Sequence, residues 1–168
     1  GFQQAVMGLR HSRVPVVAAP FGLTLGGGCE ICLGADELQA HAELYMGLVE
    51  VGVGLIPGGC GTLNLLKRLF EGVPASADPR DVDRMPLVQR AFENIGIAKI
   101  ATGAGEVFSL GYGTARDAIA MNRDRRIADA KTMTRCMADL GYLPPAPADN
   151  LVLPGRSGKA AISLFVYG

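Results

Sequence analysis

A run of three glycines that leads directly into a cysteine and a glutamate constrains this chain more than any other feature. The glycines occupy residues 26–28 and precede Cys29 and Glu30, and a short apolar run at residues 16–19 lies between two prolines upstream. The apolar run predicts a buried strand, and residues 28–35 are expected to form a short helix that begins at the glycines. Backbone without Cβ atoms admits a ligand closely, and unpaired N–H groups at a helix start favour an anion or a developing oxyanion.

Two glutamates lie in segments that are otherwise almost free of charge. Glu50 follows Glu30 by twenty positions, and both have apolar and glycine neighbours. An unpaired buried carboxylate is costly unless it is neutralised or used. Two carboxylates in such surroundings can serve as a general acid/base pair, because burial and mutual repulsion separate their pKa values. The pattern alone leaves a second interpretation equally open, in which both glutamates cap helices or lie in water.

Three motifs follow one another in a recognisable order. They are G-G-G-C-E at residues 26–30, G-L-V-E at 47–50 and I-P-G-G-C-G-T at 56–62. Their order and spacing closely resemble the centre of the enoyl-CoA hydratase/isomerase (crotonase) family. The resemblance implies a crotonase-like α/β fold, a superhelix of repeated β-β-α units.

Additional sequence segments point to one subgroup of this family. Within about residues 14–158, the chain is similar to the C-terminal crotonase part of bacterial multifunctional 3-hydroxyacyl-CoA dehydrogenases of fatty-acid β-oxidation. This similarity rests on the sequence segments at residues 45–54, 121–124 and 144–147.

The resemblance implies a role for three residues. The backbone N–H of Gly27 would supply half of an oxyanion hole for the thioester oxygen. Glu30 would hold and deprotonate the attacking water, and Glu50 would handle the proton at the α-carbon. Together they would hydrate 2-enoyl-CoA to 3-hydroxyacyl-CoA, with the enolate-like charge held by amide dipoles rather than by a metal.

The implied substrate is an acyl-CoA thioester. No cofactor is expected in this part of the polypeptide, and NAD is expected only for a dehydrogenase part. Two alternatives stay open. A Δ3/Δ2-enoyl-CoA isomerase needs only one well-placed base, and a non-catalytic acyl-CoA-binding or oligomerisation module needs neither glutamate. The intact glutamate pair favours the hydratase.

The ends of the chain depart from the family pattern. The second oxyanion N–H of crotonases comes from an A-x-A-D-like segment, and nothing before Pro15 resembles it. We therefore expect residues 1–168 to be a partial crotonase domain, truncated at the N-terminal side, inactive alone, and either oligomeric or packed on its own dehydrogenase domain. Residues 73–85 are expected to be an inserted surface loop, and residues 142–168 an extended C-terminal segment that leads to missing sequence.

Periodicity and turn residues predict the remaining elements. Strands are expected at residues 35–42 and 41–46. Helices are expected at residues 2–9, 63–70 with Thr62 as N-cap, 86–100 with Pro86 in the first turn, 106–111 and 123–140. The last of these helices carries an apolar face from Ile127 through Ala130 to Leu140.

Composition sets the broad class. A chain of 168 residues with 49% hydrophobic and 19% charged residues suits one domain with a proper core. Its net charge of zero and the absence of a Lys/Arg cluster argue against nucleic-acid binding. No uninterrupted apolar run approaches about 18 residues and no signal-peptide pattern is found, which favours a soluble, cytoplasmic protein without membrane insertion.

Other motifs in the chain give weaker evidence for a metal, redox or nucleotide site. Cys29 and Cys32 form a C-x-x-C at a helix start, but no second pair completes a zinc site, so we interpret both as small buried hydrophobes and expect no metal. The two histidines, His11 and His41, have no second ligand candidate nearby and are interpreted as structural. Two nucleotide-binding patterns fail on spacing or residue type, a Rossmann motif at 52–57 and a P-loop at 155–160.

Overall fold

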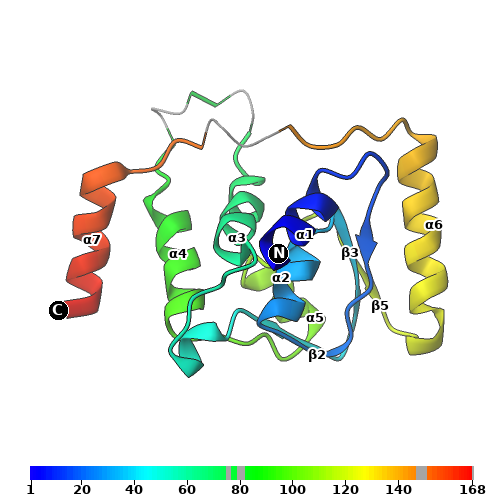
Figure 1. The fold of residues 1–168 in the computed structure, drawn as a ribbon, viewed down its shortest axis with the longest axis horizontal. Helices are drawn as coiled ribbons and strands as arrows, with labels where there is room; N and C mark the ends of the chain where they lie inside the picture. Colours follow the sequence, from blue (N-terminus) through cyan, green and yellow to red (C-terminus); the bar gives the residue numbers. More distant parts are fainter. Residues whose placement is uncertain (75–76, 79–81, 147–150, 168) are drawn as a thin grey trace.

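Parallel strands covered by helices form the centre of the molecule (Figure 1). The computed structural model describes residues 1–74, 77–78, 82–146 and 151–167. Three strands form a parallel sheet in the order β1-β3-β5, and two more pair in parallel as β2-β4. The strands are β1 (Val17–Ala18), β2 (Gly22–Leu25), β3 (Glu37–His41), β4 (Leu44–Gly47) and β5 (Ala118–Ala120).

Besides these strands, the described residues form seven α-helices and two 3₁₀ turns. The helices are α1 (Phe2–Arg10), α2 (Gly27–Gly34), α3 (Gly61–Phe70), α4 (Met85–Gly96), α5 (Ala104–Ser109), α6 (Arg126–Asp139) and α7 (Gly155–Tyr167). The 3₁₀ turns are η1 (Glu50–Val53) and η2 (Arg123–Arg125). Helix α2 packs between α1 and α3, whereas α6 and α7 lie at opposite ends of the molecule (Figure 1). This arrangement places the glycine-rich start of α2 near the middle of the fold.

The core lies between α2, α3, α5 and strands β3 and β4. Its buried side chains are mostly Leu, Ala, Cys and Met, with Tyr112 as the largest of them. Leu65 and Leu69 of α3 are buried as its 3.6-residue period predicts, and Leu66 packs against the same core. Burial of such apolar side chains, at about 25 cal/mol per Å², is what fixes α3 against α2.

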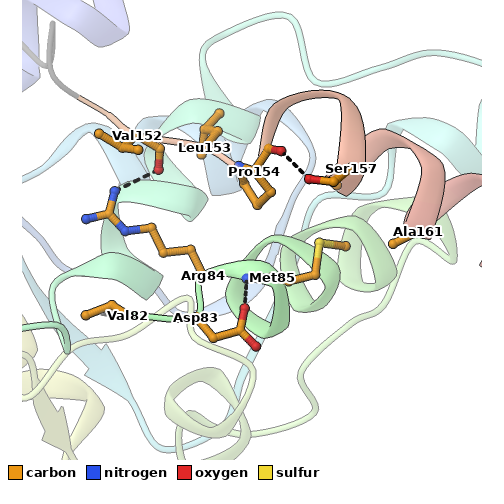
Figure 2. A pocket seen from close by; sticks show the side chains of 10 residues that line it. Val82, Asp83, Arg84, Met85, Val152, Leu153, Pro154, Ser157 and Ala161 are labelled. Carbon is orange, nitrogen blue, oxygen red and sulfur yellow. Dashed lines mark hydrogen bonds between the residues drawn. The ribbon is translucent and has the colours of Figure 1, made fainter. Parts of the chain in front are cut away.

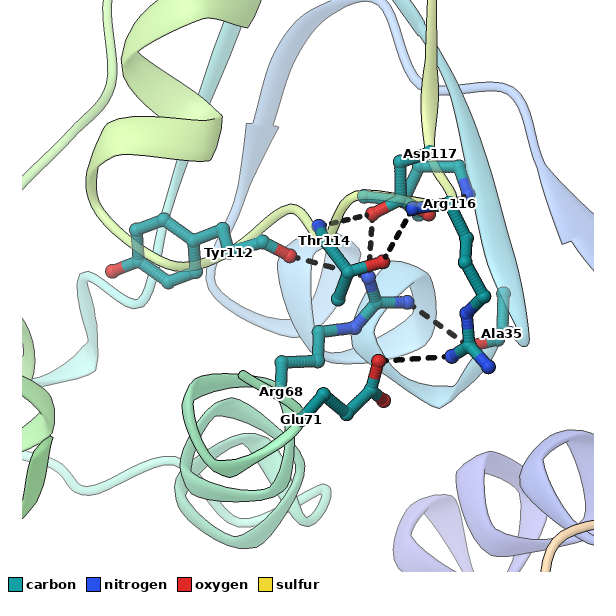
Figure 3. Close-up of polar contacts among 8 residues, drawn as sticks. Ala35, Arg68, Glu71, Tyr112, Thr114, Arg116 and Asp117 are labelled. Carbon is teal, nitrogen blue, oxygen red and sulfur yellow. Dashed lines mark hydrogen bonds and ion pairs between the residues drawn. The ribbon is translucent and has the colours of Figure 1, made fainter. Parts of the chain in front are cut away.

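A buried ion pair links the end of α3 to the sheet (Figure 3). Arg68 Nη1 lies 2.9 Å from Asp117 Oδ2, and both side chains are almost fully buried. Arg68 Nη2 also donates to the carbonyl of Ala35, while Asp117 accepts the backbone N–H groups of Leu38 and Thr114. Because every contact joins a different element, this cluster sets how α3 sits on β3 and the segment before β5.

Helix α7 is attached through the start of α4 (Figure 2). Arg84 Nη1 donates to the carbonyl of Val152 at 2.7 Å, and a cavity of about 420 Å³ separates the two segments. The side of this cavity formed by α7 includes Pro154, Ser157 and Ala161. Among the described residues that line it, Asp83 is the one carboxylate.

Most expected elements are confirmed, with boundaries that differ by a few residues. The strand expected at 16–19 is β1, the helix expected at 28–35 is α2, and Pro86 lies in the first turn of α4. The strand expected at 35–42 is β3, and the one expected at 41–46 begins later, as β4.

Three local expectations are wrong. Thr62 is not the N-cap of α3, because the helix starts at Gly61, two residues earlier than expected, and Cys60 occupies the cap position. Helix α4 ends at Gly96 rather than near residue 100, because Ala98 adopts a φ of 51° and Ala101 then pairs with Met46 of β4. The expected apolar face of the helix at 123–140 is only partly buried, with Ile127 62% and Leu140 88% exposed.

The predictions for residues 73–85 and 142–168 can be compared with the described parts of both segments. The described residues of 73–85 form neither helix nor strand until Met85 starts α4, and residues 75–76 and 79–81 lie outside the described part. Residues 142–146 form neither helix nor strand, and the extended conformation expected for 142–168 is wrong for Gly155–Tyr167, which form α7. No described helix combines the length and apolar character needed to cross a membrane.

Candidate active site

Two backbone amides hold the carboxylate of Glu30. Glu30 lies in the first turn of α2 and is only 3% exposed. Its Oε1 accepts the N–H of Gly59 at 2.7 Å and the N–H of Gly61 at 2.8 Å. Charge-assisted hydrogen bonds of this kind fix the orientation of a carboxylate.

A strained residue between those amides makes this arrangement possible. Cys60 adopts a left-handed conformation, with φ of 71° and ψ of 14°, and is followed directly by α3. A non-glycine residue in this region is uncommon and costs free energy. The turn aims the N–H groups of Gly59 and Gly61 at the same oxygen, so the strain at Cys60 coincides with the site.

The start of α2 offers a free amide beside Glu30. Gly26 adopts φ of 54° and ψ of −123°, a conformation open to glycine, and its N–H pairs with the carbonyl of Gly47 at 2.9 Å. Gly27 is the first residue of α2, so its N–H has no intrahelical partner. The ring of Phe2 lies over Gly27, with Cζ 3.4 Å from where a Cβ on Gly27 would be.

Glu50 lies at the first position of η1, next to the same glycine turn. Its Oε1 is 3.4 Å from where a Cβ on Gly26 would lie, so the carboxylate faces the start of α2. Both carboxylate oxygens are buried, and neither has a hydrogen-bond partner within the described residues. Burial raises the pKa of Glu50, and the nearby charge of Glu30 raises it further, whereas the nearby backbone of Val49 and Glu50 opposes the shift without forming a hydrogen bond of good geometry.

The structure therefore brings together the three residues that the sequence singled out. Gly27 and Glu30 start one helix, and Glu50 enters from the loop after β4. One carboxylate is fixed by two donors, and the other is unpaired with a raised pKa. Such a pair can take a proton at one position and give a proton at another.

Some features of the site were not predicted from the sequence. The contact of Gly59 and Gly61 with Glu30 and the position of the Phe2 ring both join residues far apart in the chain. Tyr112, which is fully buried, donates its O–H to the carbonyl of Lys99 and accepts the N–H of Leu48, two residues before Glu50.

Cys29, Cys32 and the two histidines lie in structural surroundings, as expected. Cys29 and Cys32 are free and buried, and burial raises the pKa of both thiols, that of Cys32 to about 11. Cys136, in α6, is exposed. His41 Nδ1 accepts the N–H of Glu43, and His11 Nδ1 lies 3.1 Å from the carbonyl of Pro145. No group of metal-ligating side chains occurs among the residues that the structure describes.

Replacing Gly61 with alanine is expected to disturb Glu30 directly. A Cβ at this position would lie 2.8 Å from Leu48 Cδ2 and 2.9 Å from both Cγ and Oε1 of Glu30. We expect a loss of about 1–3 kcal/mol in the free energy of unfolding, measured by urea denaturation, because overpacking of this kind forces neighbours to move. Gly58→Ala is the matched control, since a Cβ there meets nothing within 4 Å. Equal stability of the two variants would contradict the close contact.

Comparison with known proteins finds relatives in sequence. A Bacillus subtilis protein named "Probable 3-hydroxyacyl-CoA dehydrogenase" is 41% identical over 163 residues, which are 97% of this chain and 20% of that protein. The human peroxisomal bifunctional enzyme is 50% identical over 70 residues, 42% of this chain and 9% of its own. The chain thus spans about a fifth or less of these relatives. No family model matches it.

The fold is also that of solved enoyl-CoA hydratases. An enoyl-CoA hydratase-like protein from Thermobifida fusca, solved in complex with CoA, superposes with a TM-score of 0.63. The match covers 98% of this chain and 50% of that protein at 18% identity, so it speaks for the fold alone. The expected crotonase-like α/β fold is confirmed. Motif order, sequence relatives and fold together support placing this chain in the enoyl-CoA hydratase/isomerase (crotonase) family.

Proposed function

We propose that this chain carries the acid–base groups of a 2-enoyl-CoA hydratase that acts in fatty-acid β-oxidation. The observation that carries the proposal is the contrast between its two carboxylates. Glu30 is held by two amides, and the carboxylate oxygens of Glu50 are buried beside the same glycine turn without a hydrogen-bond partner among the described residues. The names of the relatives, a 3-hydroxyacyl-CoA dehydrogenase and a peroxisomal bifunctional enzyme, support this setting.

In the proposed reaction, water adds across the 2,3 double bond. Glu30 accepts a proton from the water as its oxygen bonds to the β-carbon. The electron pair of the double bond moves toward the thioester oxygen, where the N–H of Gly27 would stabilise the developing charge. Glu50, whose raised pKa favours the protonated form, gives a proton to the α-carbon.

The partners of the site follow from this chemistry. The substrate would be an acyl-CoA thioester, and the chemistry uses no cofactor in this part of the polypeptide. NAD would serve a dehydrogenase part of the same polypeptide. We expect the whole protein to be cytoplasmic, and this chain to form an oligomer or to pack against that dehydrogenase part.

Two substrates distinguish this function from its nearest alternative. A single unpaired base such as Glu50 would suffice for a Δ3/Δ2-enoyl-CoA isomerase. The complete polypeptide should therefore be assayed with 2-enoyl-CoA, by loss of the enoyl-thioester absorbance, and with 3-enoyl-CoA in parallel. We expect hydration of the 2-enoyl substrate to be the faster reaction. Conversion of 3-enoyl-CoA alone would support the isomerase, and conversion of neither would support a non-catalytic acyl-CoA-binding module.

A further inference from the structure

A second cavity lies at the end of α2 opposite to Glu30. It has a volume of about 730 Å³ and is lined by four arginines, which we call the arginine groove: Arg10, Arg68, Arg90 and Arg116. Arg68 donates to the carbonyl of Ala35, which directly follows α2, whereas Glu30 lies in the first turn of that helix. The eight residues of α2 therefore separate the groove from the candidate active site.

Two of these arginines carry a buried Nε–H group that has no hydrogen-bond acceptor among the described residues. Arg68 is only 4% exposed, and its Nε is buried without a hydrogen-bond acceptor. The Nε of Arg10 is likewise buried and unpaired among the described residues. Burial lowers the pKa of Arg10, and the charge of Arg68 lowers it further, so the two guanidinium groups repel each other. Buried donors without acceptors are costly, and an anion between them would relieve both effects.

Three of the four carboxylates named around the groove are already engaged in hydrogen bonds or ion pairs. Asp117 pairs with Arg68, and Glu71 pairs with Arg116 at 2.9 Å (Figure 3). Asp36 accepts the N–H of Val16 and the O–H of Tyr142, and its charge and that of Glu71 partly offset the repulsion at Arg10. Burial raises the pKa of Glu37, the remaining carboxylate of the lining.

Arg10 and Arg90 are thus the two arginines of the groove without a carboxylate partner among the described residues. Neither has a hydrogen bond or ion pair to a carboxylate within the described ranges, and both line the same cavity. Guanidinium groups bind phosphate and carboxylate oxygens through their planar fork of donors. Apolar side chains complete the lining, among them Leu69, Phe108 and Met137. We propose that the arginine groove binds a small oxyanion, a phosphate or carboxylate group, between Arg10, Arg68 and Arg90.

Calorimetric titration of inorganic phosphate into the 168-residue chain tests this site. We expect saturable binding that weakens with added salt, because the contacts are ionic. Arg10→Gln and Arg90→Gln should each weaken binding about tenfold or more, the loss of one charge-assisted contact. Arg13→Gln, an exposed arginine three positions beyond Arg10, is the control and should bind as the unsubstituted chain does.

A parallel titration with acetate separates the two chemistries. Tighter binding of phosphate would assign the site to phosphate groups, and tighter binding of acetate to carboxylates. Bound phosphate should also raise the melting temperature of the chain and of the Arg90→Gln variant less. The proposal is overturned if neither anion gives saturable heat, or if Arg13→Gln weakens binding as much as Arg10→Gln does.

Discussion

Replacing Glu50 with glutamine is expected to slow hydration of 2-enoyl-CoA by about 10²–10⁴-fold, the usual contribution of a positioned acid or base. Glutamine keeps the size of the side chain but cannot deliver a proton to the α-carbon. Glu50 is suited to that delivery because burial raises its pKa and leaves both oxygens unpaired. The variant should therefore lose kcat while it keeps most of its affinity for the thioester. The measurement is the initial rate of loss of enoyl-thioester absorbance in the complete polypeptide.

A matched substitution controls for charge alone. Glu43 is exposed in the turn before β4, seven positions from Glu50, and Glu43→Gln removes the same charge away from the glycine turn. Its hydration rate should equal that of the unsubstituted protein. Hydration that survives Glu50→Gln at a near-normal rate would contradict the role of Glu50 as the acid that protonates the α-carbon.

The Glu50→Gln variant should also show how much the Glu50 carboxylate destabilises the folded chain. Because the pKa of Glu50 is raised above its ordinary value of 4.5, the folded chain holds the proton more tightly than the unfolded chain. The stability that this provides is complete below about pH 4.5 and is lost as pH rises through the folded pKa. At neutral pH, Glu50→Gln should thus melt at a higher temperature than the unsubstituted chain, with a smaller difference in acid.

Removal of Asp117 should give the largest loss of stability. Asp117→Ala leaves Arg68 charged and buried without its ion-pair partner, and it also leaves the N–H groups of Leu38 and Thr114 without an acceptor. Breaking a buried pair in this way costs about 3–5 kcal/mol. The free energy of unfolding from urea denaturation should fall by this amount.

An exposed pair in the same region provides the comparison. Glu71→Ala breaks the contact with Arg116, whose side chain is 59% exposed, and should cost about 0–1 kcal/mol. In the double variant Arg68→Met/Asp117→Ala, part of the loss should return, because no uncompensated charge remains in the core. Equal costs for Asp117→Ala and Glu71→Ala would show that the buried pair does not organise the end of α3.

Local sequence patterns were sufficient for much of the fold. The apolar run at 16–19, the glycines before α2 and the position of Pro86 each act within one element, so their outcome depends on neighbouring residues alone. The burial of Glu30 was also foreseeable, because it lies among apolar residues in a short helix.

Contacts between distant segments were not foreseeable in the same way. Gly59 and Gly61 bind a carboxylate about thirty positions earlier, and the geometry depends on a left-handed Cys60 that no local preference indicates. Helix α4 ends early because its continuation pairs with β4, a tertiary contact that overrides helix periodicity. The exposure of Leu140 shows the reverse case, an apolar period without a surface to cover it.

The measurement that tests the central claim most directly is isotope incorporation from solvent. The complete polypeptide would convert 2-enoyl-CoA in D₂O or in ¹⁸O-labelled water, with product analysis by mass spectrometry. We predict one ¹⁸O atom at the β-carbon and one deuterium at the α-carbon, and loss of both labels in Glu30→Gln. A product without solvent oxygen, in which only the position of the double bond has changed, would contradict hydration by Glu30 and Glu50.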